Sequence, residues 1–285
     1  MKYLHLVLIV TVLCISACSN DGARGRMEVS YSRENIARGR ELARGLGACG
    51  YCHGESASPD APLSGGRVQY DMYGPVSAAN ITPAKSGIAG WSLEDFIRAL
   101  RNHKNPAGEK IAQDIHRGIE WMSDQDMAAL YAYLTSLPAR ETEVTRRSVS
   151  FVDRNTTGFF HGSREVVGYV PPPARGDEIE YGRYLTDQVA HCGACHSSRG
   201  GLLSSAGYLK GGDAVKTEIG ERVAPAIDAQ GAGSWSLDEL VSYLRTGQTP
   251  DNRISSFDYC PVQFYRNAPE AELRAVAAYL KTSGK

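Results

Sequence analysis

Two short stretches decide the fold of this chain: Cys49-Gly50-Tyr51-Cys52-His53 and Cys192-Gly193-Ala194-Cys195-His196. In each, two cysteines are separated by two residues and followed at once by a histidine. The rest of the 285-residue chain is ordinary for a globular protein, with 42% hydrophobic residues, 22% charged residues and a net charge of −1. This composition excludes disorder, collagen and low-complexity structure, and it lacks the strongly basic character of a nucleic-acid-binding protein.

The Cys-x-x-Cys-His pattern is typical of covalent attachment of c-type haem. Two cysteines at this spacing can bond to the two vinyl groups of one porphyrin, and the adjacent histidine can reach the iron from the same side. A single copy could also be a redox pair or half of a zinc site. A disulfide framework would explain neither histidine. Two copies therefore predict two haem c groups, attached through four cysteines and ligated by two histidines: Cys49, Cys52, Cys192 and Cys195, with His53 and His196.

The chain is a tandem repeat. The two motifs begin 143 residues apart, and similar segments lie on both sides of them at nearly the same offset. Similarity at a fixed offset indicates duplicated units, each here long enough to build its own core. We therefore expect a first domain at residues 34–137, a linker at 138–176 and a second domain at 177–285. The matching pairs are 35–42 with 178–185, 63–66 with 209–212, 91–97 with 235–241, and 126–134 with 272–280.

Local signals predict helices and few strands. Residues 34–46 and 178–190 carry hydrophobic residues at helical spacing and lead into the two motifs. Ser92 and Ser236 are expected N-caps, because an acidic residue follows each of them three positions later, and Ser123 opens another helix in the same manner. Gly- and Pro-rich segments separate the helices. The sequence thus predicts an all-α fold with long loops, joined by a linker that prolines stiffen.

The N-terminus predicts export. Residues 1–17 have one lysine, then a hydrophobic run too short for a secure membrane span, then small residues, as in a secretory signal. The end of this segment, up to Cys18, resembles the lipobox of bacterial lipoproteins, which implies a lipidated Cys18 and a tether at residues 18–33. Ser19 at the next position implies the outer rather than the inner membrane. A plain signal peptide or an uncleaved anchor would equally place the protein on the periplasmic side.

The repeat resembles the class I c-type cytochromes, and specifically the two- and three-haem membrane-bound subunits of periplasmic alcohol and gluconate dehydrogenases. The resemblance covers most of residues 30–283 and is closest at Asn80–Pro83, Gly87–Trp91 and His191–His196. It implies two tandem cytochrome c domains, each helical with long loops around one covalent haem.

The same resemblance assigns roles to four further residues. It implies that Gly39 and Gly182 are the points at which the first and last helices of each domain cross. It also implies that Trp91 and Trp235 lie beside the haems, although a role in the core would explain their spacing equally well.

At the position of the sixth iron ligand this sequence differs from the family, in which a methionine before the last helix normally binds the iron. No methionine follows Met127, so the second haem cannot have one from its own domain. Cys260 follows Trp235 by 25 residues, and His116 follows Trp91 by the same number. We therefore predict a His53/His116 pair at the first haem and a His196/Cys260 pair at the second.

Other assignments stay open at these positions. Cys260 could be a buried thiol and His116 a surface histidine. Met122 also lies near the start of a helix, which favours a place in the core, and His103 lies in a turn that favours solvent. The further competing ligands are Met72, Met122 and His161 for the first haem, and Tyr259 or His161 for the second.

Two saturated irons predict an electron carrier that relays single electrons between a dehydrogenase or respiratory complex and an acceptor. One alternative is a sulfur-oxidising enzyme, because thiosulfate dehydrogenases use a His/Cys haem, and Arg253 and Arg266 near Cys260 could hold an oxyanion. Another is a di-haem peroxidase, which would need an open iron site.

Overall fold

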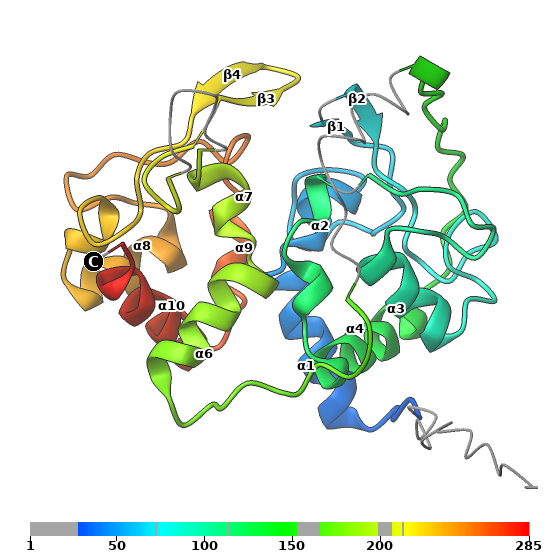
Figure 1. The fold of residues 1–285 in the computed structure, drawn as a ribbon, viewed down its shortest axis with the longest axis horizontal. Coiled ribbons are helices and arrows are strands. Elements are labelled where there is room, and N and C mark those ends of the chain that lie inside the picture. Colours follow the sequence, from blue (N-terminus) through cyan, green and yellow to red (C-terminus); the bar gives the residue numbers. More distant parts are fainter. Residues whose placement is uncertain are drawn as a thin grey trace, which may run out of the picture.

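The computed structural model describes residues 28–71, 73–112, 114–152, 166–198, 207–212 and 214–284. The predicted signal peptide, Cys18, Met72 and His161 lie outside the described residues. Figure 1 shows two groups of helices side by side, joined by a long connecting segment. We call them the first group, residues 33–136, and the second group, residues 178–282.

The first group consists of four α-helices and two single turns of 3₁₀-helix. Its elements are α1 (Arg33–Arg44), α2 (Cys49–His53), α3 (Leu93–Asn102), η1 (Asp114–His116), η2 (Ile119–Trp121) and α4 (Asp124–Ser136). Helix α1 packs along α4, and α3 lies against α4 and η2.

The second group repeats this order with small insertions. Its elements are α6 (Glu178–Tyr184), the π-helical turn η3 (Leu185–Val189), α7 (Cys192–His196), η4 (Ala232–Ser234), α8 (Leu237–Thr246), α9 (Val262–Tyr265) and α10 (Glu270–Thr282). Helix α6 packs along α10, as α1 packs along α4.

The expectation of few strands was incomplete, because each group also contains an antiparallel β-hairpin. Strand β1 (Val68–Asp71) pairs with β2 (Gly74–Ser77), and β3 (Ala214–Thr217) pairs with β4 (Gly220–Val223). Gly74 and Gly220 begin the returning strands with φ of +95° and +137°, a conformation that favours glycine. Strands β1 and β3 approach one another, so the two hairpins meet at one edge of the molecule (Figure 1). These strands have four residues each, too short for a clear alternating pattern in the sequence.

The first and last helices of each group cross at Gly39 and at Gly182, the glycines that the resemblance implies. A Cβ atom on Gly39 would lie 2.0 Å from the carbonyl oxygen of Ala129, and one on Gly182 would lie 1.9 Å from that of Ala275. No side chain fits at these distances. Both helix pairs therefore need glycine where their backbones touch.

The expected helix starts are also present. Ser92 and Ser236 each accept a hydrogen bond from the backbone N–H three residues later, and the acidic residue there reaches back, so both form complete capping boxes. Ser123 caps α4 through the N–H of Asp126. These caps satisfy backbone donors at helix ends that would otherwise lack partners.

A buried ionic network joins the two groups. The Arg38 guanidinium on α1 pairs with Asp126 on α4, at 2.8 Å from its Nε, and with Glu272 on α10. Tyr181 and Tyr184 on α6 donate to Glu272 and Asp126 at 2.6 and 2.8 Å. The side chains of Arg38, Asp126 and Glu272 are only 12, 4 and 6% exposed. Because removing one member would leave a buried charge unpaired, the network holds the groups in one arrangement.

Among the helices that the structure describes, none combines the length and hydrophobicity needed to cross a bilayer.

Candidate functional site

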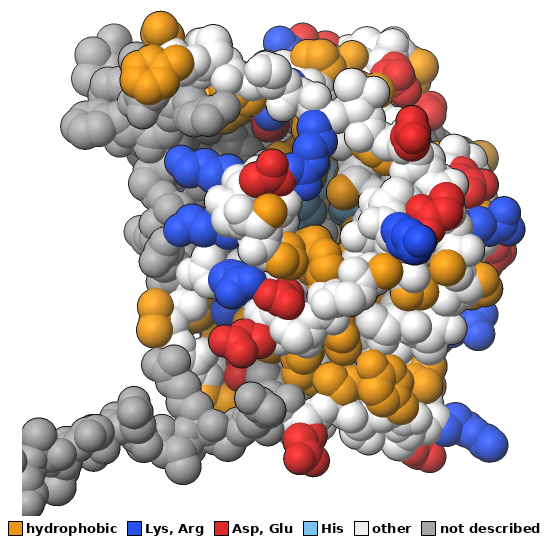
Figure 2. All heavy atoms as spheres, turned by 90° about the vertical axis from the view of Figure 1, so that its right-hand side faces the viewer, with side chains coloured by type: hydrophobic (Ala, Val, Ile, Leu, Met, Phe, Trp, Pro, Cys, Tyr) orange, Lys and Arg blue, Asp and Glu red, His pale blue; other side chains and the backbone are white. Residues whose placement is uncertain are grey.

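A cavity of about 2690 Å³ lies between the helices of both groups. On the face in Figure 2 it appears as a hollow with histidine side chains at its floor. It exceeds the volume of about 300–1,000 Å³ that is usual for one small ligand. All ten residues that the sequence predicts at the haem sites line it: Cys49, Cys52, His53, Trp91, His116, Cys192, Cys195, His196, Trp235 and Cys260.

The attachment cysteines lie on two short helices that begin in the same unusual way. Ala48 precedes α2 with φ of 43°, and His191 precedes α7 with φ of 52°, both in the left-handed region. This turn directs the cysteines of each motif into the cavity wall. The five cysteines of the described residues are free thiols rather than disulfides. Burial raises the pKa of Cys49 to about 11 and that of Cys52 to about 12, so both are protonated at neutral pH.

The two motif histidines are oriented alike. The Nδ1 atom of His53 donates to the carbonyl oxygen of Ala79, and that of His196 donates to that of Pro225, both at 2.7 Å. Burial lowers the pKa of both rings, which keeps them neutral. A donated Nδ1–H leaves the lone pair on Nε2, which is the arrangement found in histidines that bind metals.

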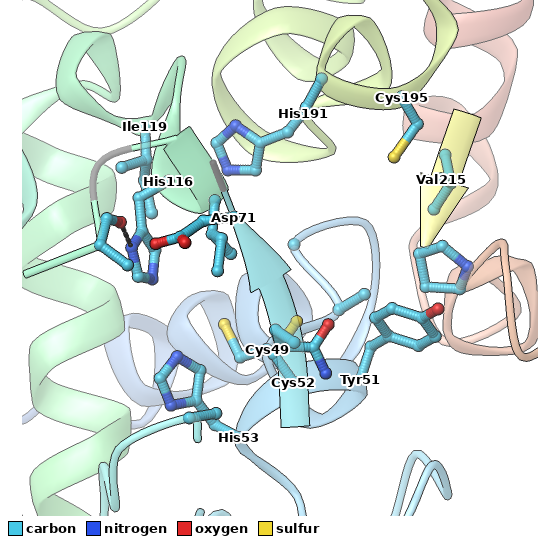
Figure 3. A pocket seen from close by; sticks show the side chains of 18 of the residues that line it. Cys49, Tyr51, Cys52, His53, Asp71, His116, Ile119, His191, Cys195 and Val215 are labelled. Carbon is cyan, nitrogen blue, oxygen red and sulfur yellow. Dashed lines mark hydrogen bonds between the residues drawn. The ribbon is translucent and has the colours of Figure 1, made fainter. Parts of the chain in front are cut away.

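His116, in η1, faces His53 across the cavity (Figure 3). Its Nδ1 atom donates to the carbonyl oxygen of Ala112 at 2.9 Å, so its Nε2 also carries the lone pair. The ring centroids lie 6.0 Å apart. An iron bound to two imidazole nitrogens at about 2 Å each would separate the centroids by about 6 Å. Burial first, and then His53, lower the pKa of His116 to about 4. The donor set and its spacing therefore fit a bis-histidine haem.

Cys260 lies just before α9 on the wall of the same cavity. Burial raises the pKa of its thiol to about 11, while hydrogen bonds from the Val262 N–H and the Tyr243 hydroxyl act in the opposite direction. Donors of this kind tune a thiolate that ligates iron. The structure thus brings Cys260 into the cavity with His196 and supplies it with polar partners.

The two tryptophans line the cavity at matching places. The carbonyl oxygen of Trp91 accepts from the Tyr131 hydroxyl at 2.7 Å, and that of Trp235 accepts from Lys281. The Trp235 ring also meets Tyr243 edge-on, with centroids 5.5 Å apart. Each tryptophan is partly buried against the core as well, so it serves the core and the cavity wall together.

One expectation about histidine was wrong. His103 is not solvated but 4% exposed, with its Nε2 3.3 Å from the Glu120 carboxylate. It forms the left-handed C-cap of α3, and the backbone folds the ring inward under η2. Met122 is in the core, at 2% exposure, as its place beside the helix cap favours.

Three residues of the site could not be assigned from the motifs: Tyr51, His191 and Tyr243. All three line the cavity. Tyr51 and His191 stand where the matching repeat position has an alanine, at Ala194 and Ala48. Comparison of the two repeats position by position would therefore have singled them out.

Known proteins of similar sequence show which family the chain belongs to. Residues 36–138 match the family described as cytochrome c. The chain is 33% identical to a nicotinate dehydrogenase subunit of Pseudomonas putida, over 89% of this chain and 22% of that protein. It is 31% identical to the fructose dehydrogenase cytochrome subunit of Gluconobacter japonicus, over 89% of this chain and 53% of that protein. The chain thus spans about a fifth to a half of these two relatives.

A third relative is closer in length. The "diheme cytochrome c-type" protein of Cereibacter sphaeroides is 31% identical over 82% of this chain and 81% of its own. Since this relative is 31% identical and is matched over 81% of its own length, and residues 36–138 match the cytochrome c model, the chain belongs to the cytochrome c family.

Proposed function

We propose that this cytochrome carries two haem c groups and relays single electrons between a dehydrogenase and an acceptor. The observation that carries the proposal is the opposed pair of neutral imidazoles, His53 and His116, whose centroids are 6.0 Å apart in a cavity that both attachment motifs line. Such a pair would hold one haem iron from both sides and would leave no coordination position for a substrate.

Each haem would be held by two cysteines and two axial donors. The first set is Cys49, Cys52, His53 and His116, and the second is Cys192, Cys195, His196 and Cys260. When bound, haem iron supplies a site that cycles between ferrous and ferric states. The chain orients the imidazoles through backbone carbonyls and lines the cavity with Trp91 and Trp235.

The two groups of helices are proposed to be tandem cytochrome c domains, at residues 34–137 and 177–285. The crossing at Gly39 and at Gly182 supports this, because each group has its own helix pair in backbone contact. Each group also has its own capped helix after the tryptophan and its own hairpin.

The relay proposal is favoured over the two enzymatic alternatives by specific contacts. Arg253 lines the cavity, but its side chain is 78% exposed and pairs with Asp251 at 2.7 Å. Arg266 does not line the cavity, so neither arginine forms a buried oxyanion site. A peroxidase would need an open iron position, whereas His116 lies opposite His53 at ligand distance.

The partner and the location are proposed from the relatives and from the N-terminus. Relatives that include the fructose dehydrogenase cytochrome subunit support a dehydrogenase as the electron donor. The N-terminal sequence supports export to the periplasmic side and a lipid anchor at Cys18 on the outer membrane.

The test is to produce the chain in a host that matures c-type cytochromes and to measure haem content and EPR of the ferric protein. We expect two covalent haems per chain and two low-spin signals, one of bis-histidine type and one of thiolate type that is lost in Cys260→Ala. A single haem, or a high-spin signal in the wild type, would contradict the proposal.

A further inference from the structure

One residue inside an attachment motif and one directly before the other motif reach out of their own group and contact the other group. They are Tyr51 in α2 and His191 at the N-cap of α7. The two repeats differ at these positions, with alanine at both counterparts. Covalent attachment and axial ligation by the motif itself need neither side chain, since the partner motif has alanine there. What Tyr51 and His191 share is that each donates a hydrogen bond to a backbone carbonyl of the opposite group.

Tyr51 belongs to the first motif and binds the loop that carries Cys260. Its hydroxyl donates to the carbonyl oxygen of Asp258, two residues before Cys260. That loop is a tight turn, in which the Tyr259 and Cys260 N–H groups both donate to the carbonyl oxygen of Ser256 at 3.2 Å. Holding the Asp258 carbonyl therefore fixes the turn from which Cys260 projects.

His191 directly precedes the second motif and binds the loop that carries His116. Its Nδ1 atom donates to the carbonyl oxygen of Arg117, the residue after His116, at 3.1 Å. The next residue, Gly118, has φ of +107°, and a Cβ there would lie 2.3 Å from the carbonyl oxygen of Asp187 and 3.0 Å from His191 Nδ1. The loop after His116 thus packs directly on the segment before the second motif. Figure 3 shows the His191 ring directed into the cavity on the side of His116.

We infer that the two sites position each other's sixth ligand: Tyr51, beside the first haem, holds the Cys260 loop of the second, and His191, beside the second, holds the His116 loop of the first. The inference rests on the proposed ligation by two haems. Both are positioning residues, because each acts through a backbone carbonyl rather than on the iron.

The physical basis is the sensitivity of axial ligation to its supporting contacts. Hydrogen bonds beyond the ligands orient them, and their loss commonly costs about 10- to 100-fold in metal affinity. A sixth ligand on a loop dissociates by movement of that loop, so an anchored carbonyl resists its replacement. Because the anchors are crossed, loosening one attachment motif should weaken ligation at the other haem.

The test measures how fast cyanide replaces the sixth ligand in the ferric protein, with EPR identifying which haem reacts. Tyr51→Phe removes only the hydroxyl and should make cyanide replace Cys260 about 10-fold faster, as measured by loss of the thiolate EPR signal. The bis-histidine signal should decay at the wild-type rate. Tyr31→Phe is the matched control, since its hydroxyl contacts Thr135 at 3.3 Å, outside the cavity lining. It should change neither rate.

His191→Ala should have the opposite selectivity, speeding replacement of His116 and leaving the thiolate signal unchanged. Alanine is tolerated in this left-handed turn, because Ala48 occupies the same position in the first motif. His191→Asn should restore the slow rate, since its amide nitrogen can donate from the place of Nδ1 and asparagine accepts positive φ.

Two results would overturn the inference while leaving the proposed function intact. One is a variant that changes only the haem of its own motif, and the other is a pair of variants with wild-type rates at both haems. A wild-type protein without two low-spin signals would overturn the proposed function, and the inference with it. Because that failure appears before any substitution is made, the two failures are distinguishable.

Discussion

The first and second groups hold their motif histidines alike and differ in the residue at the position of the proposed sixth ligand. His53 and His196 both donate Nδ1–H at 2.7 Å to a backbone carbonyl just after the hairpin of their own group. Opposite His53 stands the neutral ring of His116, oriented by Ala112. The corresponding residue of the second group is a thiol, Cys260, with a hydroxyl and an amide as donors.

This difference separates the parts of the repeat that build the fold from those that set its chemistry. The crossing glycines, the serine caps and the histidine-orienting carbonyls recur in both groups. The proposed sixth donor, its hydrogen-bond partners and the residues that bridge the groups do not recur. An anionic thiolate stabilises ferric iron more than imidazole does, so the two proposed haems should have different potentials.

The largest effect expected is loss of one haem without the other. Cys192→Ala combined with Cys195→Ala removes both attachment points of the second site and should leave one covalent haem per chain. The matched control is the pair Cys49→Ala and Cys52→Ala, which should also leave one haem but retain the thiolate EPR signal. Haem content by mass and EPR of both variants measure this. Loss of both haems from either pair would show that the two sites do not form independently.

The second prediction concerns the different sixth donors. Cys260→Met replaces a thiolate with a neutral thioether and should raise the potential of the second haem by about 0.2–0.4 V, since axial ligands span about 0.8 V. Redox titration followed by visible spectra measures the change. The first haem should titrate as in the wild type, and a shift of less than about 0.05 V at the second would mean that Cys260 does not bind iron.

The third prediction tests the network that joins the groups. Arg38→Met leaves Asp126 and Glu272 buried without their cation and should lower the free energy of unfolding by about 3–5 kcal/mol. Arg183→Met is the matched control, because its pair with Glu180 at 2.8 Å is about half exposed and should be worth less than about 1 kcal/mol. Urea unfolding of the three proteins measures the difference. Equal losses in the two variants would contradict a locking role for Arg38.

Much of this architecture could be predicted from the repeat, because its signals are local. The helix caps at Ser92 and Ser236 are where the sequence indicates, and the crossings at Gly39 and Gly182 are where the family resemblance implies them. The cavity also collects all ten predicted site residues. The spacing of the Cys-x-x-Cys-His motifs predicted the attachment residues, and the equal spacing from each tryptophan predicted His116 and Cys260.

The remaining features depend on contacts between segments far apart in the sequence. The two hairpins are too short for a periodic signal, and His103 is buried only because η2 brings Glu120 to it. Arg38 meets Glu272 across 234 residues, and Tyr51 meets Asp258 across 207. No pattern in one sequence reports such pairs.

The smallest expected effect concerns the N-caps, which both groups have. Ser92→Ala and Ser236→Ala each remove an N-cap and should cost about 1 kcal/mol. Equal losses would show that the duplicated helices contribute alike to stability, although their proposed haem sites have diverged.

Hydrogen bonds from Ser92 lower the pKa of Asp95 in the first of these caps. The stability that the ionised Asp95 adds to the cap is therefore present above the ordinary aspartate pKa, and it is lost as the pH falls through the lowered pKa of Asp95. Urea unfolding at neutral and at acidic pH should show that the cost of Ser92→Ala shrinks in acid, and a cost that is independent of pH would mean that Asp95 takes no part in the cap.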